Sequence, residues 1–139
     1  MKNEFSFPVS VQDVKKNVKK TVFSEKRLED FLQSVIQSLG CRGLRYRSAG
    51  KAVHRVAVGG GACSDYIADA IALGCDTFVT SDLSYHSFLD TRELNLIDAG
   101  HFATENVVCP AIGAYLNRQF PMLKTVLSTT HRDVIEYFM

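Results

Sequence analysis

The chain has 139 residues, of which 46% are hydrophobic and 22% are charged, so it is long enough to bury the core of one domain. No apolar run approaches the roughly 20 residues that span a bilayer, and the first ten residues contain no apolar segment typical of a secretory signal. The four cysteines show no paired metal-binding spacing, and we expect them to be reduced, mostly buried thiols. We therefore expect a cytoplasmic protein without a membrane segment.

The net charge of +1 is unevenly distributed along the chain. Residues 1–47 carry ten Lys or Arg against five Asp or Glu, whereas residues 48–139 carry six against ten. A basic segment is one mark of nucleic-acid binding. Here the lysines between residues 15 and 20 fit the solvated face of a short helix, and no aromatic residue lies among them. The pattern therefore argues against a nucleic-acid partner.

The amino-terminal part is predicted to be a connector followed by a helix that packs on a larger body. Residues 1–23 form the predicted connector, with a short Lys-rich helix over residues 11–20. The stretch 24–40 is predicted to be a longer helix, because Ser24 can cap its start and Gly40 can close its end. Apolar side chains at three- and four-residue spacing predict its buried face: Leu28, Phe31, Leu32, Val35, Ile36 and Leu39.

From residue 53 onward strand and helix patterns alternate, which predicts one α/β domain over residues 24–139. We expect a layered sandwich with a mostly parallel sheet, and an edge strand within the polar stretch 41–52. The last helix is expected to bury an apolar face that includes Val108 and Ile112. The predicted strands are 53–58, 77–80, 95–98, 125–127 and 134–138, and the predicted helices are 64–73, 85–92 and one that ends near residue 119.

Three of these strands end in unusual residues, and ligands of parallel α/β sheets bind beyond such carboxyl ends. The glycines at 59–61 join a strand to a helix. They either form a tight turn that borders a site or bring backbone N–H groups to a phosphate. The next two strand ends carry Ser81-Asp82 and Gly100-His101. Their convergence predicts one site at this edge of the sheet.

Two pairs of residues four positions apart are candidates for the chemistry of this site, because one helical turn brings such residues to the same side. His101 and Glu105 are either metal ligands or a surface histidine and a carboxylate that complements a helix dipole. Asp82 either orients His86 as a general base, or caps a short helix and leaves His86 a surface residue. Cys63, at a predicted helix start, is a less supported nucleophile.

The chain resembles the carboxy-terminal half of the Nif-three-like proteins in three segments that occur in the same order: VHRVAVGGGACSDYI (53–67), ALGCDTFVTSDLSYHSFLD (72–90) and LNLIDAGHFATE (94–105). That family consists of dinuclear-metal, ring-forming hexamers described as homologues of GTP cyclohydrolase I type 2. The resemblance covers about residues 26–139 and implies the Nif-three-like α/β fold.

The resemblance also implies roles for individual residues. The family's Gly-His-x-x-x-Glu motif supplies metal ligands, which makes His101 a ligand and Glu105 a bridging ligand. The family's Asp-x-x-Tyr-His motif lines the same cleft. The implied catalytic residues, which would handle protons, are Asp82 and His86, and the implied substrate-binding residues are Gly60, Gly61 and Tyr85.

The implied reaction is metal-assisted hydrolysis of an unidentified small molecule, with zinc, iron, manganese or nickel as the divalent ion. The family's other ligands are an adjacent His pair and an Asp from an amino-terminal half, and none of the four histidines here is adjacent to another. We therefore expect an incomplete ligand set and a partner, either that amino-terminal half or a homo-oligomer such as a hexamer. The alternative is a non-catalytic protein-interaction or regulatory module that retains the fold, with the apolar face of helix 24–40 as its surface.

Overall fold

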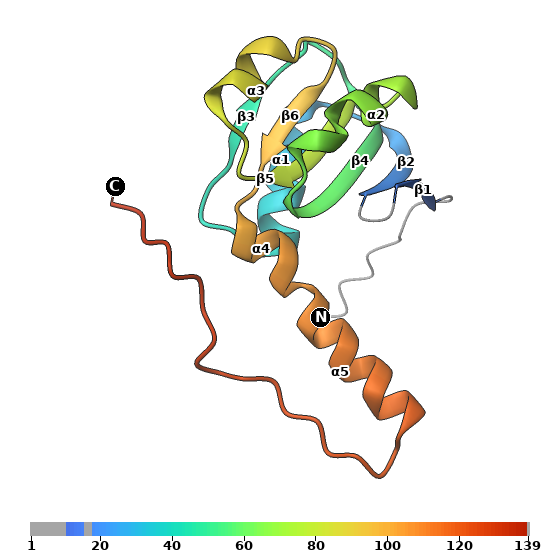
Figure 1. The fold of residues 1–139 in the computed structure, drawn as a ribbon, viewed down its shortest axis with the longest axis vertical. Coiled ribbons are helices and arrows are strands. Elements are labelled where there is room, and N and C mark those ends of the chain that lie inside the picture. Colours follow the sequence, from blue (N-terminus) through green and yellow to red (C-terminus); the bar gives the residue numbers. More distant parts are fainter. Residues whose placement is uncertain (1–10, 16–17, 139) are drawn as a thin grey trace.

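The computed structural model describes residues 11–15 and 18–138, with side chains from Val18 onward. The first ten residues of the predicted connector lie outside the described residues. The described elements run in the following order (Figure 1): β1 (Val11–Lys15), β2 (Val18–Lys26), α1 (Leu28–Leu39), β3 (Arg45–Arg47), β4 (Val53–Ala62), the 3-10 helix η1 (Ser64–Tyr66), α2 (Ile67–Ala72), β5 (Thr77–Ser81), α3 (Tyr85–Asp90), β6 (Asn95–Asp98), α4 (His101–Asn106) and α5 (Val108–Gln119).

The strands of the described residues form one mixed sheet in the order β1-β2-β4-β5-β6-β3. The three central strands, β4, β5 and β6, are parallel. β1 and β2 on one side and β3 on the other are antiparallel to their neighbours. The expectation of a mostly parallel sheet is therefore wrong at both edges, because residues 11–26 and 45–47 add antiparallel strands. The edge strand expected within residues 41–52 is confirmed as β3.

Helices cover both faces of the sheet, which confirms the layered α/β sandwich. In Figure 1, α1 lies behind the sheet, and α2 and α3 lie in front of it. Successive side chains of each central strand point to opposite faces of the sheet, because side chains in a strand alternate with a period of two. They therefore pack in two different hydrophobic cores. Phe78 and Leu96 pack with residues of α2 and α3, whereas Val79 and Ile97 pack with residues of α1. All four side chains are at most 4% exposed, which is typical of parallel strands buried on both faces.

The helix predicted over residues 11–20 is wrong, because this segment forms β1 and the start of β2. Val18 lies opposite Gly59 of β4 and is fully buried. Ser24 lies within β2 and caps no helix, so α1 begins four residues later. The domain boundary expected after residue 23 therefore falls inside a strand of the sheet.

The rest of the α1 prediction agrees with the structure. Gly40 closes the helix with a φ of 63°, and its N–H donates to the carbonyl of Ile36. Leu28, Phe31 and Val35 are buried against the sheet. Because the sheet covers this apolar face, the expectation that it serves as an interaction surface is wrong.

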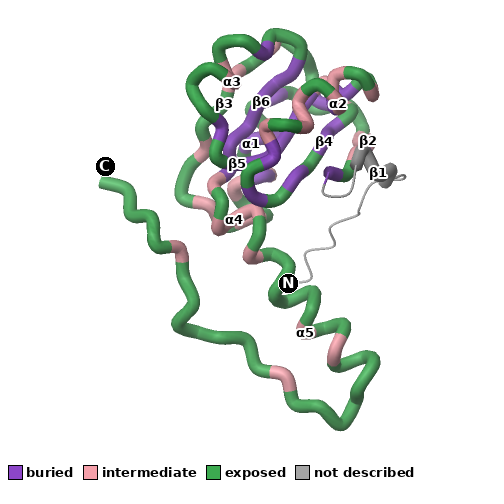
Figure 2. The backbone as a smooth tube through the Cα atoms, viewed as in Figure 1, coloured by how far each residue is buried: buried purple, intermediate pink, exposed green. Residues whose placement is uncertain are grey.

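The carboxy-terminal part differs most from its prediction. α4 ends at Asn106 and α5 leaves the body of the protein, followed by an extended tail (Figures 1 and 2). No residue of α5 is buried, so the predicted apolar inner face of this helix is wrong. The two closing strands predicted at 125–127 and 134–138 are also wrong, since neither segment forms a strand. We call residues 107–138 the arm.

No helix in the described part of the chain combines the length and the apolar character that crossing a membrane requires.

Replacing Phe78 by alanine tests the core assignment. Phe78 is 0% exposed on β5, so Phe78→Ala is expected to lower the free energy of unfolding by about 3–5 kcal/mol through lost burial and the cavity left behind. Phe120→Ala removes the same atoms from a side chain that is 58% exposed and should change it by less than about 1 kcal/mol. Urea denaturation measures both, and equal losses would contradict the assignment.

Candidate metal centre

His101 and Glu105 are brought together by α4, which begins directly after the carboxyl end of β6 and packs against β4 and β5. Nε2 of His101 lies 3.2 Å from Oε2 of Glu105. The two side chains are 47% and 56% exposed, so both remain accessible to an ion from solvent. The structure therefore shows the convergence that their four-residue spacing predicted.

The carboxylate of Asp82 fixes the other side of the imidazole. Nδ1 of His101 donates a hydrogen bond to Oδ2 of Asp82 over 2.5 Å. This bond and the nearby carboxylate of Glu105 raise the pKa of His101 above its ordinary value. Asp82 was expected to orient His86 or to cap a helix, and the structure differs on both counts. Its carboxylate binds His101, and the hydroxyl of Ser84 caps α3 by accepting the N–H of Ser87.

Asp82 has the only positive φ among the described non-glycine residues, at 55°. This left-handed conformation disfavours most side chains, but aspartate and asparagine tolerate it better than others do. It occurs where the chain turns out of β5 towards α3. The same turn brings the carboxylate to a histidine 19 residues further along the chain.

Gly60 and Gly61 lie inside β4, where they allow α4 to come close to the sheet. A Cβ atom on Gly61 would overlap Oε1 of Glu105, and one on Gly60 would lie 3.0 Å from the carbonyl oxygen of Thr104. The N–H of Gly61 donates to Oγ1 of Thr104 over 2.9 Å. This donor is therefore used inside the protein, which argues against the phosphate-cradle alternative. The expected tight turn is also wrong, since β4 continues to Ala62.

Two buried polar side chains hold the strand ends around this site. Thr80 is 0% exposed; its hydroxyl donates to the carbonyl of Gly61 over 2.9 Å and accepts the N–H of Cys63 over 3.2 Å. Asp98 is 5% exposed and accepts the N–H groups of Leu83 and Gly100, each over 3.1 Å. Neither residue was predicted to have a role in the site. The available signal was a polar side chain at the last positions of a buried strand.

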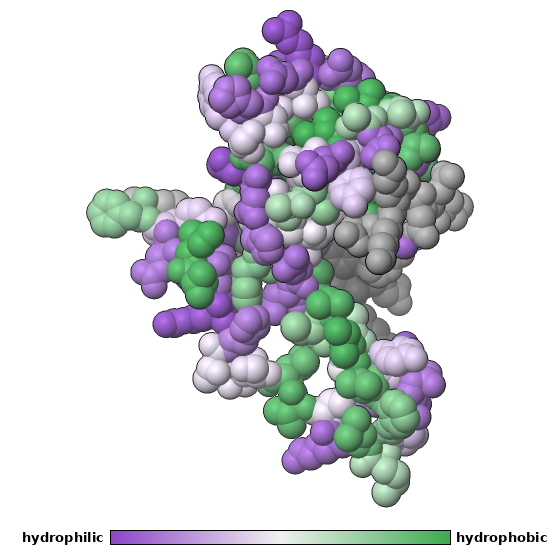
Figure 3. Space-filling model, in the orientation of Figure 1, coloured by the Kyte–Doolittle hydropathy of each residue, from purple (hydrophilic) through white to green (hydrophobic). Residues whose placement is uncertain are grey.

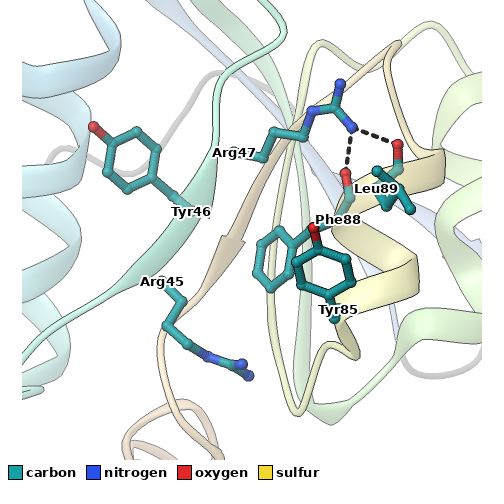
Figure 4. Close-up of a pocket in the computed structure, with 6 residues that line it drawn as sticks. All are labelled: Arg45, Tyr46, Arg47, Tyr85, Phe88 and Leu89. Carbon is teal, nitrogen blue, oxygen red and sulfur yellow. Dashed lines mark hydrogen bonds between the residues drawn. The ribbon is translucent and has the colours of Figure 1, made fainter.

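Tyr85 and His86 lie on α3, with their rings edge to face at 6.2 Å. Tyr85 is 75% exposed and borders a hollow of about 440 Å³ between α3 and β3 (Figure 4). Arg47 crosses this hollow and donates to the carbonyls of Phe88 and Leu89 at the end of α3. The lining of this hollow includes neither residue of the metal pair. The substrate role of Tyr85 and the catalytic role of His86 therefore stay predictions.

A second hollow, of about 510 Å³, borders the metal pair itself. His101 and Glu105 line it together with residues of the arm, including Cys109 and His131. The ring of His131 lies 5.0 Å from that of Phe102, so the tail passes beside α4. Even so, the described residues contain no group of three or more His, Cys, Asp or Glu side chains that could hold a metal ion.

The environment of Cys63 is that of a buried packing residue rather than of a nucleophile. All four are free; Cys63 and Cys75 are buried, as expected, whereas Cys109 is exposed. Burial raises the pKa of the Cys63 thiol, and its Sγ donates to the carbonyl of Gly60 over 3.4 Å. Because a nucleophilic cysteine requires a lowered pKa, this environment favours the packing role.

Comparisons with known proteins place this arrangement in a family. The sequence profile of Duf34/NIF3 (NGG1p interacting factor 3) matches residues 6–134. A Staphylococcus aureus protein named GTP cyclohydrolase 1 type 2 homolog is 31% identical over 123 residues, which cover 84% of this chain and 33% of that protein. A protein of the same name from Clostridium acetobutylicum is 38% identical over 81 residues, 56% of this chain and 30% of that protein.

Solved structures show the same fold. A Bacillus cereus protein related to NIF3 is 28% identical with a TM-score of 0.71, and the match covers 87% of this chain and 36% of that one. A Staphylococcus aureus crystal structure matches with a TM-score of 0.75 at 24% identity over 87% of this chain and 42% of that one. This chain thus spans about a third of the length of its curated relatives.

Replacing each of two glycines by alanine tests the close contact between β4 and α4. Gly61→Ala introduces a Cβ that overlaps Glu105, whereas Gly50 has a similar φ, 71° against 69°, with no atom within 4 Å of such a Cβ. Gly50→Ala therefore measures the backbone penalty alone. We expect Gly61→Ala to lower the free energy of unfolding by about 1–3 kcal/mol more than Gly50→Ala does.

Chemical denaturation measures this difference, and the histidine NMR signals report whether the His101 ring moves. Equal destabilisation by the two substitutions, with the His101 signals unchanged in Gly61→Ala, would mean that α4 does not depend on the bare glycine.

Proposed function

The chain belongs to the Duf34/NIF3 family, and from this premise we propose that it supplies two ligands, His101 and Glu105, to a divalent-metal centre that another polypeptide completes. One observation carries the proposal. The bond from Nδ1 of His101 to Asp82 leaves Nε2 as the ring nitrogen that faces the Glu105 carboxylate, 3.2 Å away. A histidine held at one nitrogen by a carboxylate, with its other nitrogen directed at the ion, is the usual arrangement of a metal-binding imidazole.

The donor chemistry fits a divalent ion. An imidazole nitrogen and a carboxylate oxygen suit zinc, iron, manganese or nickel. The space next to the carboxylate is kept open by Gly61, where a Cβ would overlap the Glu105 oxygen. Two protein donors are fewer than the three that a catalytic ion usually takes, so the centre needs further ligands.

His101 and Glu105 would hold a divalent ion in the completed centre, and the chemistry that such an ion would supply is the activation of water for hydrolysis. The residues of this chain have separate tasks. Asp82 keeps Nδ1 of His101 protonated and fixes the plane of the ring. His86, exposed on α3, is the candidate for moving protons to and from a substrate, and Tyr85 beside it offers an aromatic face and a hydroxyl.

The substrate is a small molecule whose class stays open. The curated relatives carry a name that refers to GTP cyclohydrolase. In this chain the N–H of Gly61 is already bonded to Thr104, so the glycine segment gives no support to binding of a nucleotide phosphate there. We therefore propose metal-assisted hydrolysis and do not propose GTP as the substrate.

A second function, as a non-catalytic interaction module, is favoured by one observation. The arm exposes most of the large apolar side chains that the described residues leave in solvent. Association with another polypeptide is compatible with either function, and metal binding by His101 and Glu105 distinguishes them.

Metal titration tests the proposed ligands. With Zn²⁺ or Mn²⁺ as the probe, His101→Ala and Glu105→Ala are each expected to weaken binding at least tenfold, because each removes one of two donors. His86→Ala, which removes a histidine of α3 outside the pair, should leave the affinity within twofold. Calorimetry and elemental mass spectrometry measure this, and binding that persists in both ligand variants would contradict the proposal.

Substitution of Asp82 separates orientation from ligation. Asparagine tolerates the positive φ of this residue, so Asp82→Asn keeps the backbone but removes the charge beside His101. We expect metal affinity to fall about tenfold, the usual effect of losing the carboxylate behind a ligand histidine. NMR of the imidazole nitrogens should also show an altered tautomer ratio. An unchanged affinity and tautomer ratio would remove the positioning role of Asp82.

A further inference from the structure

We propose that the open edge of β3 binds an extended acidic peptide, which adds to the sheet as a further strand. The proposal goes beyond the metal centre and does not depend on it. In the described residues, β3 is the last strand of the sheet and pairs only with β6. Its other edge therefore carries backbone N–H and C=O groups without a strand partner. Such groups are the usual template for strand addition.

The hollow between α3 and β3 follows this open edge (Figure 4). All three residues of β3, Arg45, Tyr46 and Arg47, line it. Figure 4 shows Arg45 and Arg47 on the side of β3 that faces α3, and Tyr46 on the opposite side, as the alternation of side chains in a strand requires. A hollow that touches all three residues lies along an edge of the strand. Because β6 occupies one edge, the hollow lies along the other.

Two kinds of surface meet in this hollow, which has a volume of about 440 Å³. α3 contributes an apolar surface from Tyr85, Phe88 and Leu89, and β3 contributes the side chains of Arg45 and Arg47. A glutamate side chain on an added strand matches both. Its methylene groups can cover the apolar surface of α3 while its carboxylate pairs with a guanidinium of β3.

The edge is basic along its whole length. Residues 41–52 contain four Lys or Arg and no Asp or Glu, and the lining of the hollow includes no acidic residue. Arg47 donates hydrogen bonds to the carbonyls of Phe88 and Leu89, and Lys51 donates to that of Glu93. These bonds satisfy donors without cancelling the positive charge. Charge complementarity therefore selects a strand that carries carboxylates at alternate positions.

The same arginines argue against a second copy of this chain as the occupant. If β3 paired with β3 of another copy in antiparallel register about Tyr46, Arg45 of each copy would lie opposite Arg47 of the other. Like charges directly opposite each other destabilise a strand pair. A single-stranded nucleic acid would match the charge, but its backbone cannot pair with the alternating N–H and C=O groups of a strand edge. An acidic peptide satisfies both requirements.

The edge is held in place by the rest of the protein. Arg45 pairs with the carboxylate of Asp98. On the carboxyl side of β3, Oδ1 of Asn95 accepts the N–H of Ala49 over 2.8 Å, and Nδ2 of Asn95 donates to the carbonyl of Lys51 over 3.0 Å. A fixed edge loses little freedom when a strand is added to it, which favours binding.

Binding of a designed peptide to the full chain tests the proposal. The probe is a fluorescein-labelled eight-residue peptide of alternating Glu and Val, which places its carboxylates on one face. We expect saturable binding by fluorescence polarisation, with NMR shifts of the backbone amides of residues 45–47. Two control peptides should each bind at least tenfold more weakly: one with Lys in place of Glu, and one with every backbone nitrogen methylated, which cannot donate to the edge.

A matched pair of variants locates the site. Leu89→Asp places a carboxylate in the hollow, at a side chain that is 48% exposed, and should lower the affinity at least tenfold. Ile112→Asp makes the same kind of change at a side chain that is 51% exposed on the arm, and should leave the affinity within twofold. Figure 3 shows the hydrophobic side chains of the arm gathered away from the body of the protein. Circular dichroism of both variants should match that of the parent chain.

Several results would each overturn the proposal. They are the absence of saturable binding, equal affinity for the methylated peptide, an affinity that Leu89→Asp leaves unchanged, or tighter binding of a twelve-nucleotide oligothymidylate than of the probe. Self-association that shifts the amides of residues 45–47 without peptide would assign the edge to a second copy instead. If Leu89→Asp fails to fold, the peptide comparison still decides, because it uses the parent chain. None of these readouts involves metal, so they are independent of the metal titration.

Discussion

The carboxylate of Asp98 accepts hydrogen bonds from the N–H groups of Leu83 and Gly100 and pairs with the guanidinium of Arg45. Leu83 follows Asp82, and Gly100 precedes His101, so this one carboxylate fixes the backbone next to both residues of the Asp82–His101 bond. Arg45 also donates to the carbonyl of Leu83 over 3.0 Å. A buried carboxylate is costly unless it is paired and hydrogen-bonded, and Asp98 meets both conditions. The geometry of the candidate site thus depends on a residue that does not belong to it.

A second constraint is the distance between β4 and α4. The pairing of β4 with β5 passes from Val58–Val79 to Ala62–Ser81, so β4 has two extra residues and bulges where its glycines lie. The bulge interrupts the regular pattern of hydrogen bonds between the two strands. The hydroxyl of Thr80 replaces part of it within the sheet, and that of Thr104 bonds the bulge to α4. The same local irregularity therefore brings the helix close and leaves room beside the Glu105 carboxylate.

Local patterns predicted the elements whose partners are local or whose burial is complete. β6 was predicted with its observed ends, and Gly40 was identified as the end of α1, because a buried apolar run and a helix-closing glycine are signals within the sequence. Residues 11–20 were misassigned as a helix because the lysines between residues 15 and 20 repeat at helical spacing. One strand that pairs with β2 is β4, where Gly59 lies opposite Val18, and no local pattern indicates so distant a partner. Likewise, four-residue spacing correctly paired His101 with Glu105 but paired Asp82 with His86. The bond from Asp82 to His101 spans 19 residues and arises only from the strand order.

The two closing strands that were predicted but are not formed say something about the composition of the tail. Residues 125–127 and 134–138 have the composition of buried strands, yet the described chain gives them no sheet to join. Exposed apolar side chains gathered in one region are a common mark of interaction sites. Because the arm starts one residue beyond α4, its apolar side chains begin close to the two half-exposed metal donors. The candidate metal centre and the exposed apolar arm therefore belong to one region of the molecule, since α4 and α5 are separated by a single residue.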